Sequence, residues 1–263
     1  MDSASLFTIP QLMLERLDVG WTFLLLLTRY TVFMMLVPGL GGGMNGITVR
    51  YPAAVVLALA SLNPAQAVAV PVDMWLLAAQ LVSEVLLGNI VALIPLTIVA
   101  GAQTAGHLAS GTMGLNAAQL IDPTTSAALP DLARIYSDLS IIVFLLVGGH
   151  YLVISELAGL EQTIRPGSFV LSASGLETLI SQSARIFQIG CLIAAPVIVA
   201  LLLTNFVMGL ISKAVPTINI FIISFPLTIG IGLMISMIAL PEVVHFMGQE
   251  FTRLEGVLDQ ALH

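Results

Sequence analysis

The chain has 263 residues, of which 58% are hydrophobic and only 9% are charged, and its formal net charge is −7. Soluble domains carry about 25% charged residues, so this chain lacks the polar side chains to cover its own surface in water. The composition excludes an ordinary soluble globule, and the eight basic residues form no patch that would bind nucleic acid.

Six apolar segments follow one another along the chain and predict an all-α membrane protein. They cover residues 19–38, 52–70, 74–109, 136–157, 186–211 and 218–246. The last two lie within runs that contain no charged side chain, residues 186–212 and 214–241. A helix of that size is roughly 40 Å long, whereas the hydrocarbon core of a bilayer is about 30 Å thick. We therefore expect long helices that are not simple membrane spans.

Prolines inside these segments predict bent helices. A proline in a helix interior removes a hydrogen bond and kinks or breaks the helix. We expect such kinks at Pro95, Pro196, Pro216 and Pro226. The link between the last two segments, residues 212–216, is short, and a short link predicts an antiparallel helical hairpin.

The beginning of the chain does not have the pattern of a cleaved signal peptide. Such a peptide starts with basic residues and ends at a small-residue cleavage site. Here Asp2, Glu15 and Asp18 stand against Arg16 alone before the first apolar segment. We expect the hydrophobic segments themselves to direct insertion into the membrane.

A row of small side chains interrupts the apolar sequence in its middle. The row repeats at every fourth position, at Ala102, Gly106, Ser110, Gly114 and Ala118. Residues four apart share one helix face, and small residues there allow another backbone to approach closely. Each glycine, however, weakens a helix by about 1 kcal/mol relative to alanine. We therefore predict a pliable, tightly packed loop, and Asp122-Pro123 would end any helix that reached it.

Catalytic, cofactor and metal motifs are not found. The sequence contains no Walker motif, dinucleotide fingerprint or metal-ligand cluster. Cys191 is the one cysteine, and we expect it to be a small buried core residue. The sequence therefore predicts a non-enzymatic protein without a cofactor or a bound metal.

Two other functions fit parts of the sequence. Polar groups inside apolar segments mark the pathways of secondary transporters, which also use proline-broken helices. The residues that fit this alternative are Arg29, Glu84, Asn89, His107 and Glu156. A rhomboid-like intramembrane protease is a weaker alternative, with Ser110 as nucleophile and His150 as base, although residues 108–111 lack the first glycine of the Gly-x-Ser-Gly turn.

A set of short motifs, in order along most of the chain, resembles the FliR family of type III export-gate proteins. Each motif is weak alone, and their order and spacing make the resemblance specific. They are Ala105-Gly106-His107, Met113-Gly114-Leu115, Asp122-Pro123, Leu129-Pro130, Leu132-Ala133-Arg134-Ile135, Gly149-His150-Tyr151, Ala195-Pro196, residues 213–221 and Ser224-Phe225-Pro226-Leu227. Residues 132–135 and 223–227 look closer to the flagellar branch than to the virulence branch.

The resemblance implies a structural subunit of the flagellar protein export gate in the bacterial inner membrane, within the basal body. It implies FliP-like, FliQ-like and FlhB-like partner subunits, unfolded polypeptides as export substrates, and long kinked hairpins stacked in a helical array. It also implies a FliP-like part at residues 1–185, a FliQ-like hairpin at 186–246 and a C-terminal tail at 247–263.

The resemblance further implies that a loop matching residues 106–123 plugs the channel. The loop residues are Gly106, Ser110, Gly111, Met113, Gly114, Leu115, Asn116, Asp122 and Pro123. Small side chains would let such a plug pack closely and move at low cost. The sequence departs from the family pattern at Lys213 and Thr217, where members commonly have Arg and Gln, and lysine lacks the planar fork of arginine.

Overall fold

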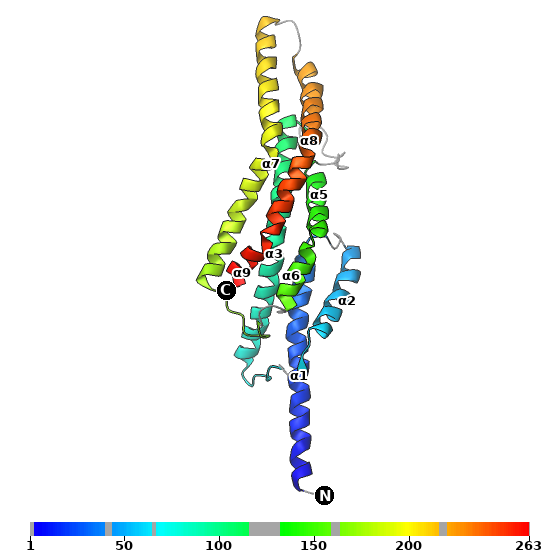
Figure 1. Cartoon of the computed structure of the whole chain (residues 1–263), viewed down its shortest axis with the longest axis vertical. Helices are drawn as coiled ribbons and strands as arrows, with labels where there is room; N and C mark the ends of the chain where they lie inside the picture. The colour runs from blue at the N-terminus through cyan, green and yellow to red at the C-terminus, as the bar shows by residue number, and fades with distance from the viewer. Residues whose placement is uncertain are drawn as a thin grey trace. The chain divides into compact units, whose positions relative to one another are not determined.

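The computed structural model describes residues 3–39, 44–64, 67–115, 132–158, 164–215 and 220–262 (Figure 1). Every regular element in these ranges is a helix, as the sequence predicts. They are α1 (Ser3–Leu36), α2 (Met44–Ala60), α3 (Met74–Met113), α5 (Leu132–Leu146), α6 (Gly149–Ala158), α7 (Ala173–Ala214), α8 (Ile220–Thr252) and α9 (Leu254–Leu262).

The chain divides into two compact units. The first comprises Met1–Leu96, Gly148–Leu179 and Leu254–His263, and the second comprises Thr97–Val147 and Ile180–Arg253. The first unit therefore contains α1, α2, the beginning of α3, α6 and α9. The second contains the end of α3, α5, most of α7 and α8.

Apolar packing of α1 holds the first unit together. α1 packs on α2, and Leu25 and Phe33 of α1 are buried, as is Ala54 of α2. Gly88 of α3 lies so close to α1 that an added Cβ would be 2.6 Å from the carbonyl oxygen of Arg29. Burial of this apolar face stabilises the helices more than their intrinsic propensity does.

In the second unit, paired glycines bring α3 and α7 together. A Cβ added to Gly101 would lie 2.7 Å from Cγ2 of Ile189, and one added to Gly190 would lie 2.8 Å from Cγ2 of Thr104. Each helix thus offers a glycine where the other presents a branched side chain, which is the small-residue packing typical of membrane helices.

α5 and α8 complete the second unit. The two helices pack on one another, and the Phe144 and Phe251 rings lie 5.3 Å apart between centroids. α8 runs antiparallel to α7, because Arg185 near the beginning of α7 binds Glu250 near the end of α8. The predicted helical hairpin is therefore present, although its tip at residues 216–219 lies outside the described residues.

Three of the four prolines at which the sequence predicts kinks lie within helices and do not end them. Pro95 lies in α3, Pro196 in α7 and Pro226 in α8, and each helix continues on both sides. Figure 1 shows α7 as a bent helix. Pro216 lies outside the described residues.

The predicted fourth segment is broken into two helices. α5 ends at a turn in which Gly148 has φ +79°, and α6 follows with a bend of 66°. A positive φ suits glycine because it has no Cβ. Among the described residues, four helices are long and apolar enough to cross a membrane, or five if the bent pair counts as one span.

The prediction of a loop in the small-residue row is wrong for its first part. α3 continues without interruption to Met113. The cost of glycine in a helix is offset where Gly101 and Gly106 let α3 approach α7 and α5. The four-residue spacing was the better guide, since it indicated one helix face available for close packing.

Candidate functional site at the end of α3

α3 ends in a glycine turn with a defined hydrogen-bond pattern. The Gly114 amide donates to the Gly111 carbonyl at 3.2 Å, and the Leu115 amide donates to the Ser110 carbonyl at 3.1 Å. Gly114 itself has φ +83°. These two bonds and the left-handed glycine form a Schellman motif, which satisfies the last carbonyl groups of a helix. The sequence at 110–115 thus sets the point where the chain leaves α3.

The side chain and carbonyl of Met113 fix this helix end against α8. Met113 is 1% exposed, and a Cβ added to Gly232 would lie 2.6 Å from its Cε. The Thr228 hydroxyl lies within hydrogen-bonding distance of the Met113 carbonyl, at 3.2 Å, and of the Phe225 carbonyl, at 3.1 Å. Because a hydroxyl carries one proton, the Thr228 hydroxyl shares that proton between these two carbonyl oxygens.

A second close approach joins α3 to the beginning of α5. A Cβ added to Gly106 would overlap the Cα and backbone nitrogen of Ala133. Leu132 and Ala133 are both buried. No side chain larger than hydrogen fits at position 106 without moving one of the two helices.

The described residues on either side of segment 116–131 both lie near α3. Leu115 follows the terminal turn of α3, and Ala133 at the beginning of α5 lies beside Gly106. α3 continues for seven residues after Gly106, to Met113, which is about 10 Å along the axis, and Leu115 follows two residues later. An extended chain as long as 116–131 would reach roughly 50 Å. The segment thus joins two fixed points that lie much closer together than its length.

The predicted plug residues fall into three groups. Gly106, Ser110, Gly111 and Met113 belong to the last turns of α3, with Gly111 alone exposed. Gly114 and Leu115 form the terminal turn. Asn116, Asp122 and Pro123 lie outside the described residues.

Comparison with known proteins identifies the family. The profile described as "Bacterial export proteins, family 1" matches residues 20–254. The chain belongs to this family, the FliR family. It is 32% identical to the flagellar biosynthetic protein FliR of Escherichia coli over 60% of this chain and 61% of that protein. It is 30% identical to the FliR of Pectobacterium carotovorum over 71% of each chain.

A more distant similarity is to a protein that is named for protein translocation. It is 24% identical to the Yop proteins translocation protein T of Yersinia pestis over 80% of this chain and 82% of that protein. The resemblance stated from the sequence motifs is therefore confirmed at the level of the family. Members of this family are membrane proteins of flagellar and type III export systems.

Two of the polar residues that fitted a transporter, Arg29 and Glu84, form a buried ion pair in this FliR-family chain. Arg29 and Glu84 are 2% and 0% exposed, and Nε of Arg29 lies 2.5 Å from Oε2 of Glu84. Nη1 of Arg29 also donates to the Leu157 carbonyl at 3.1 Å, and Glu84 accepts a bond from the Gly167 amide. A buried pair with its hydrogen bonds made is a structural connection within the first unit.

The residues that fitted a protease belong to different compact units, Ser110 to the second and His150 to the first. The Ser110 hydroxyl and Nδ1 of His150 are both buried, and neither has a hydrogen-bond partner among the described residues. A serine nucleophile needs its base within hydrogen-bonding reach. Membership of the FliR family favours protein export over both alternatives.

The residues of α8 that contact Met113 were not predicted from the sequence. Thr228 and Gly232 lie in the apolar stretch 227–233, where no motif marks them. A glycine in a strongly apolar helix is the signal that could have indicated a close contact at Gly232. The expectation for Cys191 is wrong, because this cysteine is exposed on α7, where the neighbouring Leu192 is also 62% exposed.

Proposed function

We propose that this chain is the FliR-like, channel-forming subunit of a flagellar type III protein export gate in the bacterial inner membrane, within the basal body. In this role it is a structural component and not an enzyme. It assembles with FliP-like and FliQ-like subunits and has an FlhB-like neighbour. Segment 106–123 closes the channel until an unfolded export substrate passes.

The arrangement at the end of α3 supports the plug. A plug needs rigid attachment and a short, deformable closing segment, because it must seal against ions and still yield to a polypeptide. Gly114 and Met113 supply one fixed end, and the contact of Gly106 with Ala133 supplies the other. Between them, residues 116–121 carry no charge and residues 117–118 are alanines. Residues 106–115 are then the base of the proposed plug, and residues 116–123, which lie outside the described residues, are its proposed moving part.

The exposed apolar surface of α7 and α8 supports assembly with other subunits. Only 17% of the most apolar stretch of Ile223–Leu262 is buried within the protein, against 61% for Met74–Met113. Large side chains such as Phe206 and Met237 are 64% and 78% exposed. An apolar surface of this extent needs lipid or neighbouring subunits as its solvent.

The same reasoning extends to the organisation of the chain. We assign a FliP-like role to residues 1–185, a FliQ-like role to the hairpin at 186–246 and a tail to 247–263. The two compact units divide the chain by internal packing, whereas this assignment divides it by similarity to other subunits. The hairpin assignment draws support from the antiparallel α7 and α8 and from their uncharged length.

Ion conductance of the assembled gate tests the plug. Deletion of residues 116–121 shortens the proposed moving part and leaves the Schellman turn and α5 in place. We expect the complex to assemble in normal amount and the membrane to become permeable to small ions. A variant with residues 116–121 in scrambled order is the control, because it keeps length and composition, and it should remain sealed.

Two outcomes would count against this proposal. Normal ion impermeability in cells that carry the deletion, with the complex assembled, would remove the plug. A chain that is monodisperse alone, does not co-purify with FliP-like or FliQ-like proteins and transports a solute would remove the export-gate function and favour the transporter.

A further inference from the structure

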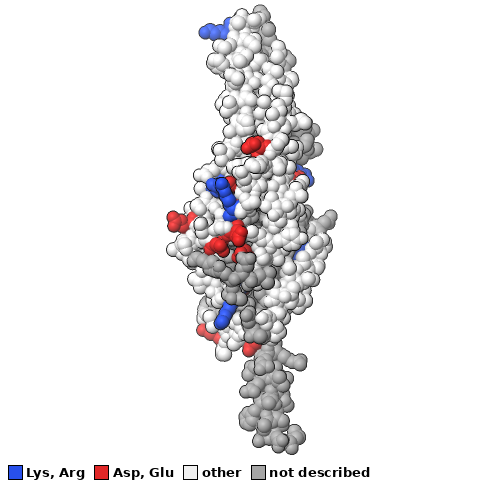
Figure 2. All heavy atoms as spheres, in the orientation of Figure 1, with Lys and Arg blue, Asp and Glu red and all other residues white. Residues whose placement is uncertain are grey.

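The α7–α8 hairpin carries an isolated carboxylate within its apolar surface. Residues 186–212 and 214–241 contain no charged side chain, and Figure 2 shows an almost entirely uncharged surface over the upper part of α7 and α8. Glu242 is the first charged residue after this stretch in α8, and it is exposed. The next acidic residue of α8 is Glu250, eight positions and about 12 Å further along the helix.

The two carboxylates have different surroundings. Glu250 is 5% exposed and receives two hydrogen bonds from Arg185, at 2.7 and 2.8 Å, and one from Arg253, at 3.0 Å. Glu242 has no ion-pair partner within the ranges that the structure describes. Glu250 is thus paired with two arginines within the chain, whereas Glu242 has no such partner among the described residues.

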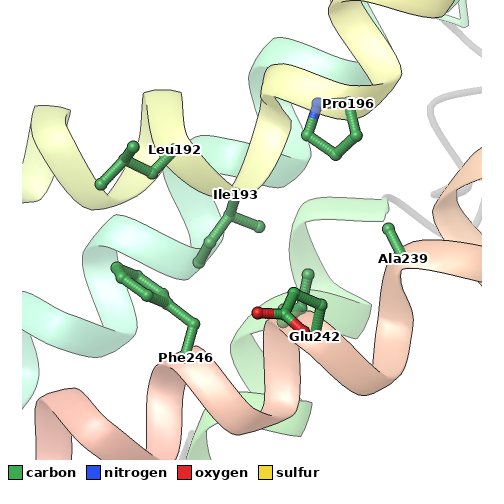
Figure 3. Close-up of a pocket in the computed structure, with 7 residues that line it drawn as sticks. Leu192, Ile193, Pro196, Ala239, Glu242 and Phe246 are labelled. Carbon is green, nitrogen blue, oxygen red and sulfur yellow. The ribbon is translucent and has the colours of Figure 1, made fainter.

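Glu242 lines a cavity between α7 and α8 whose other walls are apolar. The cavity has a volume of about 390 Å³ and is lined by Leu192, Ile193, Pro196, Ala239, Glu242, Val243 and Phe246. Figure 3 shows the Glu242 carboxylate directed into the space between the two helices, on the same helix as the Phe246 ring. The cavity combines a mostly apolar lining with a single carboxylate, which is typical of a specific binding pocket and not of a nonspecific apolar surface.

We propose that apolar side chains from a helix of another export-gate subunit fill this cavity, and that a Lys or Arg side chain on that helix pairs with Glu242. The inference rests on the proposed function, because the partner belongs to the same assembly. A carboxylate next to apolar walls is stabilised by an opposite charge that enters with the partner. The pairing also selects one register, since a helix displaced by a turn brings its cation to the wrong depth.

Other occupants fit the cavity less well. A lipid acyl chain would fill the apolar walls and leave the carboxylate unpaired in a low-dielectric setting. A second copy of this chain would present its own α7 and α8, whose basic residues Arg185, Lys213 and Arg253 lie outside the uncharged stretches. Arg185 and Arg253 are moreover bound to Glu250.

Charge reversal at Glu242 tests the pairing. The full chain is co-expressed with the FliP-like and FliQ-like proteins of the same bacterium, and the yield of the purified complex is measured. We expect Glu242→Lys to lower the yield about tenfold or more through like-charge repulsion, and Glu242→Gln to lower it by a smaller factor. Glu177→Lys is the matched control, because Glu177 is exposed on α7 outside the uncharged stretch, and it should leave the yield within about twofold.

Cross-linking identifies the occupant. A photoreactive residue at Leu192 should cross-link to a helix of a partner subunit, and peptide mapping should find a Lys or Arg near the linked position. Changing that cation to Glu should restore the yield of Glu242→Lys to within about twofold of wild type. Cross-links only to lipid, or to a second copy of this chain, would overturn the proposal.

Failure of the Glu242 pairing can be distinguished from failure of the proposed export-gate function. If the wild-type complex forms and Glu242→Lys gives the same yield as Glu177→Lys, the pairing is wrong and the export-gate function stands. If the wild-type chain brings down neither partner, both the function and the pairing fail.

Discussion

The guanidinium of Arg29 in α1 binds the carboxylate of Glu84 in α3 through two hydrogen bonds, Nε to Oε2 at 2.5 Å and Nη2 to Oε1 at 3.1 Å. The pair also connects two further segments, because Arg29 reaches the Leu157 carbonyl and Glu84 receives the Gly167 amide. Four parts of the first unit therefore meet at one buried pair of charges. Breaking it leaves an uncompensated charge and an unsatisfied backbone group in an apolar interior.

Removal of one partner should be more harmful than removal of both. We expect Arg29→Ala or Glu84→Ala to lower the free energy of unfolding by about 3–5 kcal/mol, and the double variant Arg29→Met with Glu84→Leu to lower it much less. The measurement is unfolding of the detergent-solubilised complex by denaturant. Arg134→Ala serves as control, because its pair with Asp138 is 3.8 Å long and solvent-exposed. Equal losses in the single and double variants would contradict this account.

Sequence patterns predicted the helical class and the long apolar helices, because long uncharged runs have few alternatives to helices in a bilayer. They also identified Arg29 and Glu84 as unusual intramembrane charges. They did not predict that these two residues bind each other, since 55 positions separate them. Side chains distant in the sequence acquire their partners only through the fold.

The small-residue row shows where local propensity was misleading. Glycine content at 101–114 predicted a loop, whereas the structure continues α3 to Met113. Glycine destabilises an isolated helix, but here it permits backbone contacts that a single sequence does not reveal. The prediction that Cys191 is buried was wrong for a different reason. Hydrophobicity alone does not distinguish a face that packs in the core from a face that meets lipid or a partner.

A methyl group at Gly106 should disturb the contact between α3 and α5. The added Cβ would overlap the backbone of Ala133, which a side-chain rotation does not relieve. We expect Gly106→Ala to lower the free energy of unfolding by about 1–3 kcal/mol, although alanine is the better helix former. Gly248→Ala in α8 is the matched control, because nothing lies within 4 Å of its added Cβ, and it should be neutral or stabilising. A Gly106→Ala variant as stable as Gly248→Ala would show that the two helices are not in close contact.

Met113 and Gly232 should respond as a coupled pair. An alanine at Gly232 would collide with the end of the Met113 side chain, whose nearest atoms lie 2.6 Å from the added Cβ. Shortening that side chain by Met113→Ala makes room for the methyl group. The double variant should therefore lose less stability than the sum of the single variants, with a coupling of about 0.5–3 kcal/mol in a double-mutant cycle of unfolding measurements. Simple additivity would exclude the contact.

Gly114 connects the fold with the proposed gate, and its substitution should affect both. With φ +83° at this residue, Gly114→Ala should cost about 1–2 kcal/mol, whereas Gly114→Asn should cost less because asparagine tolerates the left-handed region. The strain would be relieved by rotating the chain that leaves α3, which displaces segment 116–131. Ion conductance of the assembled gate should then rise in the order wild type, Gly114→Asn, Gly114→Ala. Gly248→Ala is the control, because Gly248 lies in α8 outside segment 106–123 and nothing lies within 4 Å of its added Cβ, so that alanine there should leave the gate sealed. A leak in Gly248→Ala equal to that in Gly114→Ala would mean that the direction of the chain after Gly114 does not determine closure.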